Sequence, residues 1–312
     1  MSSLFKKIFI VTGSVVAIAS AVIGTNLFSV VPKAIENTTW MKNLDDSAKL
    51  SELSIPGTHD SGATHSIGDV AGKCQDLTIA QQLNLGVRFL DMRVQLRKDD
   101  LHVVHGFVDQ NLKFSDAMNT CGQFLRDNPS EALLISVKED ADPSNSSVAF
   151  ESKMSEIMQS AFGSDFYKES TLPATLGDAR GKAILLSRYE ESTIGVDCSS
   201  GWADNKVSFD LGCGIHVQDY YKFADSEEKK QPVLDCLEYA QSNSATHSSP
   251  LVINFFSGYL SQGFPPSYSV PVAKVMKPFA LEHIKDYTCT GACLFDFVTQ
   301  GLCDEIIGRN SL

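Results

Sequence analysis

Residues 87–94, with the sequence VRFLDMRV, form a short run of strand-forming apolar residues that also carries charged ones. Seven further short apolar runs occur at residues 50–56, 101–105, 132–138, 183–188, 214–218, 251–256 and 293–298. Segments 77–85, 114–127, 148–162, 226–242 and 270–287 instead place apolar residues three to four positions apart, which is typical of surface helices. Short strands that alternate with helices predict a mostly parallel sheet.

The numbers of strands and helices refine this prediction. Eight strand candidates indicate an α/β barrel, but only five good helices are available to connect them, so some strands must be joined directly. The sequence therefore predicts an irregular or incompletely closed TIM (β/α)8-type barrel. Such barrels occupy about 250 residues as one unit. We expect residues 50–312 to form one barrel domain, preceded by a lead-in at residues 22–49.

Composition and charge exclude several classes of protein. The chain has 312 residues, 43% of them hydrophobic and 21% charged, which excludes a disordered or fibrous protein. It carries 26 Lys and Arg against 38 Asp and Glu, for a net charge of −12, and no basic cluster exceeds two residues. We therefore expect no nucleic-acid partner. We also expect a monomer.

The N-terminal segment has the form of a secretory signal peptide at residues 1–21. Lys6-Lys7 precede an apolar run at residues 8–23, and Ala19-Ser20-Ala21 fits a cleavage site. Cleavage after Ala21 would remove two lysines and no acid, which changes the net charge from −12 to −14. The alternative is an uncleaved signal anchor that extends to about residue 31. We expect a secreted protein, or in the alternative one anchored in a membrane.

Eight cysteines lie beyond this segment, and none belongs to a Cys-x-x-Cys pair, so the sequence predicts no zinc site and no other metal site. In an exported protein they predict up to four disulfides, whose pairing the sequence leaves open, and buried free thiols are the alternative. Asn37-Thr38-Thr39 and Asn145-Ser146-Ser147 have the form of glycosylation acceptors.

Polar and charged residues lie at the ends of most predicted strands, and in a barrel of this kind those ends meet at one rim. The set comprises His59, Asp60, Asp91, Arg93, His105, Lys138, Arg188, Asp219, Tyr221 and Asp296. Any one of these residues alone is most simply a structural hydrogen-bond partner. Together, two histidines with carboxylates and a central arginine suit phosphoryl transfer, because one histidine can take a proton while the other gives one. Histidine fits both roles, since its unperturbed pKa is about 6.5.

Seven segments resemble, in order, the signature blocks of the phosphatidylinositol-specific phospholipase C X-domain family, in its bacterial-type single-domain branch. They are SIPGTHDS at 54–61, GVRFLDMR at 86–93, HVVHG at 102–106, LISVK at 134–138, GKAILLSRY at 181–189, VQDYY at 217–221 and FDF at 295–297. The resemblance implies a phosphodiesterase that cleaves phosphatidylinositol, or glycosyl-phosphatidylinositol anchors, to diacylglycerol and inositol 1,2-cyclic phosphate.

The resemblance also implies catalytic roles. His59, oriented by Asp296, would be the general base on the inositol 2-hydroxyl. His105, backed by Asp60, would be the general acid that protonates the diacylglycerol oxygen. Both pairs join a histidine to a carboxylate, which can fix the tautomer of the ring.

Arg93 would bind the phosphate by the same resemblance, with Asp91 holding its neighbours in place. In calcium-dependent members of the family the metal supplies the positive charge that Arg93 supplies here, so we expect no cofactor, with Ca²⁺ as the alternative. Four further residues would contact the inositol ring, three by hydrogen bonds and the last by stacking: Lys138, Arg188, Asp219 and Tyr221.

A lipid substrate requires contact with a membrane, and the negative net charge does not favour an anionic surface. Apolar insertion is the better mechanism, and the aromatic segment after residue 255 lies at the expected rim. The candidate contacts are Tyr259, Leu260, Phe264 and Tyr268. Two other functions stay open, namely a phosphodiesterase for a different lipid head group and a catalytically silent phosphoinositide-binding protein on the same scaffold.

Overall fold

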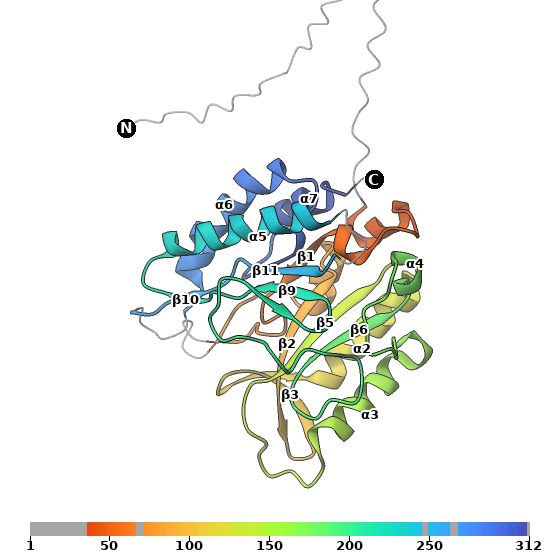
Figure 1. The fold of residues 1–312 in the computed structure, drawn as a ribbon. Helices are drawn as coiled ribbons and strands as arrows, with labels where there is room; N and C mark the ends of the chain where they lie inside the picture. The colour runs from red at the N-terminus through yellow and green to blue at the C-terminus, as the bar shows by residue number, and fades with distance from the viewer. Residues whose placement is uncertain (1–35, 67–71, 245–248, 263–267, 311–312) are drawn as a thin grey trace, which may run out of the picture. The chain divides into compact units, whose positions relative to one another are not determined.

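A curled, mostly parallel sheet forms the centre of the molecule in the computed structural model, which describes residues 36–66, 72–244, 249–262 and 268–310 (Figure 1). Nine strands follow one another across it in the order β7 (Val196–Asp197), β6 (Ala183–Arg188), β5 (Leu133–Glu139), β2 (Phe89–Arg97), β1 (Ser54–Thr58), β13 (Gly291–Phe295), β11 (Leu251–Phe255), β9 (Ile215–Gln218) and β8 (Phe209–Leu211). Within the described residues the edge strands β7 and β8 do not pair with each other. The prediction of an incompletely closed barrel is therefore confirmed.

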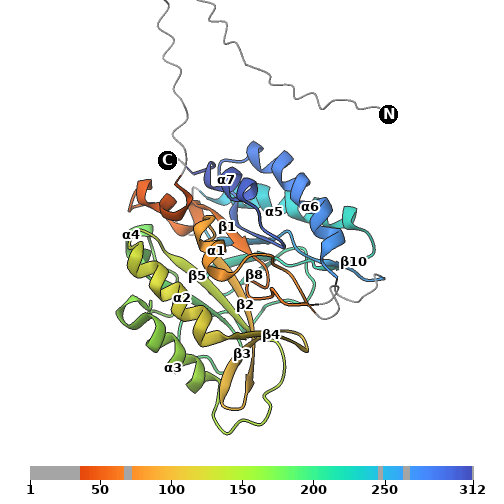
Figure 2. The ribbon, with the colours of Figure 1, turned by 180° about the vertical axis from the view of Figure 1, so that it is seen from behind.

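Helices cover the outer face of this sheet in two groups (Figures 1 and 2). Helices α2 (Phe114–Asp127) and α3 (Phe150–Phe162) pack against each other on the half that contains β2 and β5. Helices α5 (Lys230–Asn243), α6 (Val270–His283) and α7 (Gln300–Ile307) cover the other half, and α1 (Ile79–Asn84) and α4 (Leu176–Ala179) are short. All five predicted helices are present, although residues 226–229 form a 3₁₀ turn before α5.

The strand predicted at residues 101–105 is present, but its expected place among the strands of the barrel was wrong. It is β3 (Asp100–His105), which pairs antiparallel with β2 and with β4 (Val108–Lys113). Only Lys98 and Asp99 connect β2 to β3, and both have positive φ. Because so short a connection can join only antiparallel strands, β3 must run back along β2. Val94 lies opposite Val103, and this register returns His105 to the carboxyl-terminal side of the sheet.

Residues 36–49 pack against the opposite end of the sheet, where the strands begin. Trp40 is buried there and donates a hydrogen bond to the carbonyl of Gly86 over 3.0 Å. Arg88 and Glu131, each just before a strand, form a fully buried ion pair of 2.8 Å, and Arg88 also donates to the carbonyl of Thr38 over 2.7 Å. This part of the lead-in therefore belongs to the same compact unit as the barrel, which spans Ile35–Leu312.

Several features expected of an exported protein can be located in the structure. No sulfur–sulfur bond joins the eight cysteines in the structure, and the predicted disulfides stay a prediction. Cys198 and Cys213, just after the edge strands β7 and β8, bring their Sγ atoms to 3.7 Å. Asn37 is buried and its amide donates to Leu85 and Asp304, whereas Asn145 is exposed.

The N-terminal predictions cannot be compared with the fold, because the signal peptide at residues 1–21 and the alternative anchor lie outside the described residues. Among the residues that are described, no helix combines the length and the apolar character that a membrane span requires.

Candidate active site

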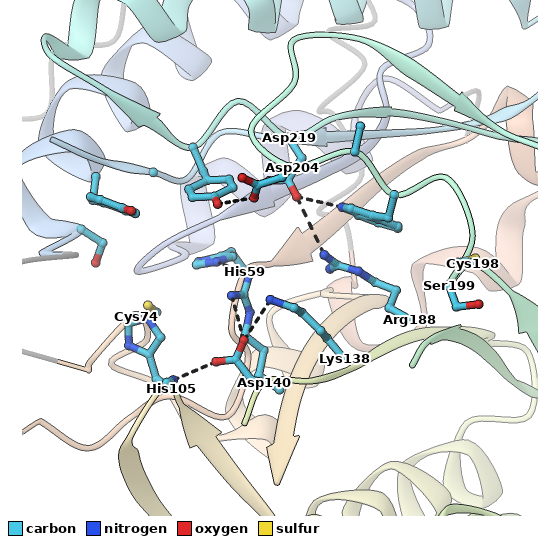
Figure 3. A pocket seen from close by; sticks show the side chains of 18 residues that line it. His59, Cys74, His105, Lys138, Asp140, Arg188, Cys198, Ser199, Asp204 and Asp219 are labelled. Carbon is cyan, nitrogen blue, oxygen red and sulfur yellow. Dashed lines mark hydrogen bonds and ion pairs between the residues drawn. The ribbon is translucent and has the colours of Figure 1, made fainter. Parts of the chain in front are cut away.

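A cavity of about 420 Å³ opens at the carboxyl-terminal ends of the strands (Figure 3). The predicted residues lie here because the carboxyl-terminal ends of parallel strands meet at one edge of the sheet. His59 follows β1, Arg93 lies in β2, and Lys138 and Arg188 lie at equivalent positions of β5 and β6. His105 lies instead at the end of β3, which is antiparallel to its neighbours β2 and β4. A cavity of this size fits a small polar ligand or head group.

His59 lines the cavity and forms a tight pair with Asp296. They follow the paired residues Thr58 and Phe295 of β1 and β13, so the parallel register itself brings them together. His59 Nδ1 lies 2.8 Å from Asp296 Oδ1. Burial alone would lower the pKa of His59, but the charge and hydrogen bond of Asp296 outweigh it and raise this pKa above its ordinary value. With Nδ1 held by the carboxylate, Nε2 is the atom that faces the reaction.

Arg93 lies beside that nitrogen, with its Nη2 atom 3.0 Å from His59 Nε2. Three carboxylates surround the guanidinium: Asp91 at 3.6 Å, Asp60 at 3.8 Å and Asp140 at 3.7 Å. Burial opposes the charge of Arg93, but these acids raise its pKa above the ordinary value. Arg93 is therefore a permanent cation in the cavity wall.

Asp91 lies behind Arg93 and is fully buried. It accepts a hydrogen bond from Arg188 over 3.1 Å and one from the backbone of Asp60 over 3.2 Å. Burial raises the pKa of Asp91, but Arg93 and Arg188 outweigh it, and the net pKa is below the ordinary value. Asp91 thus contacts both arginines, and the supporting role expected of it stays a prediction.

His105 lines the cavity, and its Nε2 atom lies 3.7 Å from Asp60 Oδ2, which is beyond hydrogen-bond length. Neither carboxylate oxygen of Asp60 has a hydrogen-bond partner, and neither does Nδ1 of His105. Burial raises the pKa of Asp60 more than the charges of His105 and Arg93 lower it, so this pKa lies above its ordinary value. The pair is adjacent but looser than the pair of His59 and Asp296.

The residues expected to hold inositol line the same cavity. Lys138 donates to Asp140 over 3.0 Å, and Arg188 lies 3.8 Å from Asp219. Tyr221 lines the cavity, and its hydroxyl lies 2.5 Å from Asp204. All four predicted residues, Lys138, Arg188, Asp219 and Tyr221, therefore face one space.

Sequence reasoning missed several residues that line this cavity. Trp202 stacks on the Arg188 guanidinium at 3.6 Å and donates to Asp219 over 2.9 Å. Trp202 and Asp204 lie in the irregular connection between β7 and β8, where strand-end logic gives no signal. Asp140 follows β5 directly, so reading two residues past Lys138 would have found it.

The predicted membrane contacts differ in their surroundings. Tyr259, in β12 (Tyr259–Leu260), lines the cavity and packs on Tyr221 at 5.9 Å, while Leu260 is half-buried against an apolar cluster. Tyr268 is half-buried, and Phe264 lies outside the described residues. Phe107, which sequence reasoning missed, is 90% exposed and lies two residues after His105.

Comparisons with known proteins show which family this chain resembles. Residues 47–189 match the family model described as phosphatidylinositol-specific phospholipase C, X domain. A 1-phosphatidylinositol phosphodiesterase from Staphylococcus aureus is 32% identical over 243 residues, which are 72% of this chain and 76% of that protein. A solved structure of a variant phosphatidylinositol-specific phospholipase C from Staphylococcus aureus matches with a TM-score of 0.78 and 27% identity, over 89% of this chain and 98% of the other. The phosphatidylinositol-specific phospholipase C of Listeria monocytogenes, 22% identical, shares the fold with a TM-score of 0.70 over 89% and 100% of the two chains.

Proposed function

Because the chain belongs to the bacterial-type phosphatidylinositol-specific phospholipase C family, we propose that it cleaves phosphatidylinositol to diacylglycerol and inositol 1,2-cyclic phosphate. One observation carries the proposal: Arg93 Nη2 lies 3.0 Å from His59 Nε2, in a cavity that His105 also lines. A phosphodiester bound to the Arg93 guanidinium would therefore lie between a base and an acid.

The proposed reaction is an intramolecular transfer. His59 Nε2 takes the proton of the inositol 2-hydroxyl, and the resulting oxygen attacks phosphorus. The bond between phosphorus and the glycerol oxygen breaks, and His105 supplies the proton that this oxygen needs. Arg93 stabilises the charge that develops on the phosphoryl oxygens, and as a fixed cation it would take the place of a metal. We therefore propose a reaction that needs no Ca²⁺.

Recognition of the head group follows from the other polar residues that line the cavity. Lys138 and Arg188 offer hydrogen-bond donors and Asp219 offers acceptors, a mixed set that suits the several hydroxyls of an inositol ring. A glycosyl-phosphatidylinositol anchor carries the same phosphodiester, so we include it as a second substrate of the same site.

The proposal is tested by ³¹P NMR of phosphatidylinositol micelles with the purified protein in EDTA. We expect a cyclic phosphodiester signal with the unaltered protein and none with His59→Ala. A parallel sample with a glycosyl-phosphatidylinositol protein measures release of the anchor. Absence of the cyclic product with and without Ca²⁺ would refute the proposed function.

We also propose that Phe107 contacts the membrane. The diacylglycerol leaves on the side of His105, and Phe107, in the turn that follows it, exposes an aromatic ring to solvent. Burial of such a ring is worth about 1.5–3 kcal/mol. Phe107→Ser should therefore weaken binding to phosphatidylcholine vesicles by roughly 10–100-fold.

A matched control is Leu281→Ser, because Leu281 is also an exposed apolar residue but lies near the far end of α6. We expect this variant to bind vesicles normally, and we expect Phe107→Ser to hydrolyse soluble inositol 1,2-cyclic phosphate at the normal rate. Equal loss on lipid and on soluble substrate would show that Phe107 acts on the fold or the chemistry rather than on the membrane.

Finally, we propose that the protein is exported as a monomer after cleavage behind Ala21. In an oxidising compartment Cys198 and Cys213 would be the first cysteines to join, because their Sγ atoms are 3.7 Å apart, and an exposed Asn145 would be the available glycan acceptor. Peptide mapping of secreted protein without reduction tests the cleavage site, the disulfide and the glycan, and size-exclusion chromatography with light scattering tests the monomer. Retention of residues 1–21 would support the anchor instead.

A further inference from the structure

Cys74 occupies a central position that the proposed reaction does not use. Its side chain lines the cavity and the residue is 1% exposed. Two backbone hydrogen bonds hold it in place, one donated to the carbonyl of Ala63 over 2.8 Å and one accepted from the amide of Phe297 over 2.8 Å. Figure 3 shows the thiol on the same side of the cavity as His105.

The Cys74 thiol is close to possible metal ligands on two sides. Its Sγ atom, an Asp60 oxygen and a His105 nitrogen all lie within 4.8 Å of one another, and Sγ forms a similar trio with His59 and Asp296. Ligand atoms in a tetrahedral zinc site are separated by about 3.3–3.8 Å, given Zn–N of about 2.0 Å and Zn–S of about 2.3 Å. Small side-chain rotations would therefore bring either trio to ligating distance.

The two trios differ in how their polar atoms are already satisfied. His59 and Asp296 are hydrogen-bonded to each other at 2.8 Å, and His59 Nε2 lies 3.0 Å from Arg93 Nη2, so that Asp296 Oδ2 alone lacks a partner in that trio. Asp60, in contrast, is completely buried with no hydrogen-bond partner on either oxygen, and His105 Nδ1 is buried without one. Because unsatisfied buried polar atoms cost free energy, the second set gains more from a bound cation. We propose that Asp60, Cys74 and His105 form a binding site for Zn²⁺ or a similar borderline-soft divalent cation, and that occupancy of this site inhibits the enzyme.

The ligand set determines which cation fits. Thiolate, imidazole and carboxylate together are typical zinc ligands, whereas Ca²⁺ and Mg²⁺ prefer oxygen ligands alone. Arg93 Nε, 3.8 Å from Asp60 Oδ2, opposes a cation, but Asp91 and Asp140 already offset its charge. Burial, followed by the charges of Asp296 and Asp60, raises the pKa of the Cys74 thiol well above its ordinary value, so binding must displace a proton from sulfur.

Inhibition follows from the identity of one ligand and rests on the proposed function. A metal on the imidazole of His105 replaces one of the two ring protons of the imidazolium and ties the ring to Asp60 and Cys74, so that His105 is no longer free to protonate the leaving diacylglycerol oxygen. Metal binding itself does not depend on that function, so the two statements are tested by separate measurements.

The binding measurement uses Co²⁺ as a coloured substitute for Zn²⁺, with the full chain. A Cys198→Ser/Cys213→Ser background removes the thiol pair that could bind metal elsewhere. In this background we expect a thiolate-to-cobalt absorption band that Zn²⁺ abolishes and that Cys74→Ser lacks. Cys121→Ser, a change of another buried cysteine on α2, should retain the band. No band, or a band that survives Cys74→Ser, would overturn the site.

The activity measurement follows hydrolysis of phosphatidylinositol during a Zn²⁺ titration, with each variant normalised to its own rate without metal. Loss of a directly ligating residue should weaken inhibition by more than the roughly 10–100-fold typical of supporting residues around a metal. Zn²⁺ should also raise the unfolding temperature of the background protein but not that of Cys74→Ser, which separates a lost site from a lost fold. Inhibition unchanged by Cys74→Ser would refute the inhibitory role. If no variant is active, the cobalt band still decides the site.

Discussion

Replacing His59 with alanine is expected to lower the turnover of phosphatidylinositol by roughly 10²–10⁴-fold, the range that general-base catalysis typically contributes. The physical reason is that Asp296 holds Nδ1 at 2.8 Å, so that Nε2 is the available proton acceptor. The measurement is steady-state hydrolysis of micellar phosphatidylinositol. His65→Ala is a matched control, because His65 is an exposed histidine close by in sequence. Equal losses in both variants would contradict a specific role for His59.

The pH dependence gives a second readout of the same base. A base works unprotonated, so activity falls as the pH drops through the pKa of His59. Burial lowers this pKa and Asp296 more than compensates, so the acidic limb of kcat/KM should lie above the ordinary histidine value. In Asp296→Asn the charge that raises the pKa is gone, and the limb should move to lower pH. An unmoved limb would show that another group sets it.

The site could be predicted to a large extent because it is built from strand ends. His59 and Asp296 are 237 positions apart, yet both directly follow paired parallel strands, so sequence pattern and sheet geometry together are enough to join them. The same holds for Lys138 and Arg188, which are direct partners in the register of β5 and β6.

The residues of the site that the sequence did not predict lie in irregular connections between strands. Trp202 and Asp204 have no periodic context, and their place against Arg188 and Tyr221 depends on the path of a loop. The antiparallel hairpin was misread for a related reason. Residues 101–105 have the composition of any strand, and only the two-residue connection at Lys98 and Asp99 reveals the direction of the chain.

Arg93→Ala is expected to reduce kcat by roughly 10²–10³-fold. The loss of one hydrogen-bond donor to a negatively charged transition-state oxygen has this effect in other enzymes. The guanidinium is the cation closest to the proton acceptor of His59, and no neutral side chain could offset the charge that develops on phosphorus-bound oxygens. Arg97→Ala is the matched control, because Arg97 lies on the same strand but pairs with Asp109 outside the cavity. Added guanidinium should restore part of the rate of Arg93→Ala only.

The same residue decides whether the reaction needs a metal. If Arg93 supplies the positive charge that binds the phosphate, the unaltered protein should work equally well in EDTA and in Ca²⁺. The Arg93 guanidinium is held by three carboxylates, and a chelator cannot remove it. Arg93→Ala would leave Asp60, Asp91 and Asp140 without their shared cation, so its fold must be checked by thermal unfolding before its rate is interpreted. Loss of activity in EDTA that Ca²⁺ restores would transfer the phosphate-binding role from Arg93 to a metal.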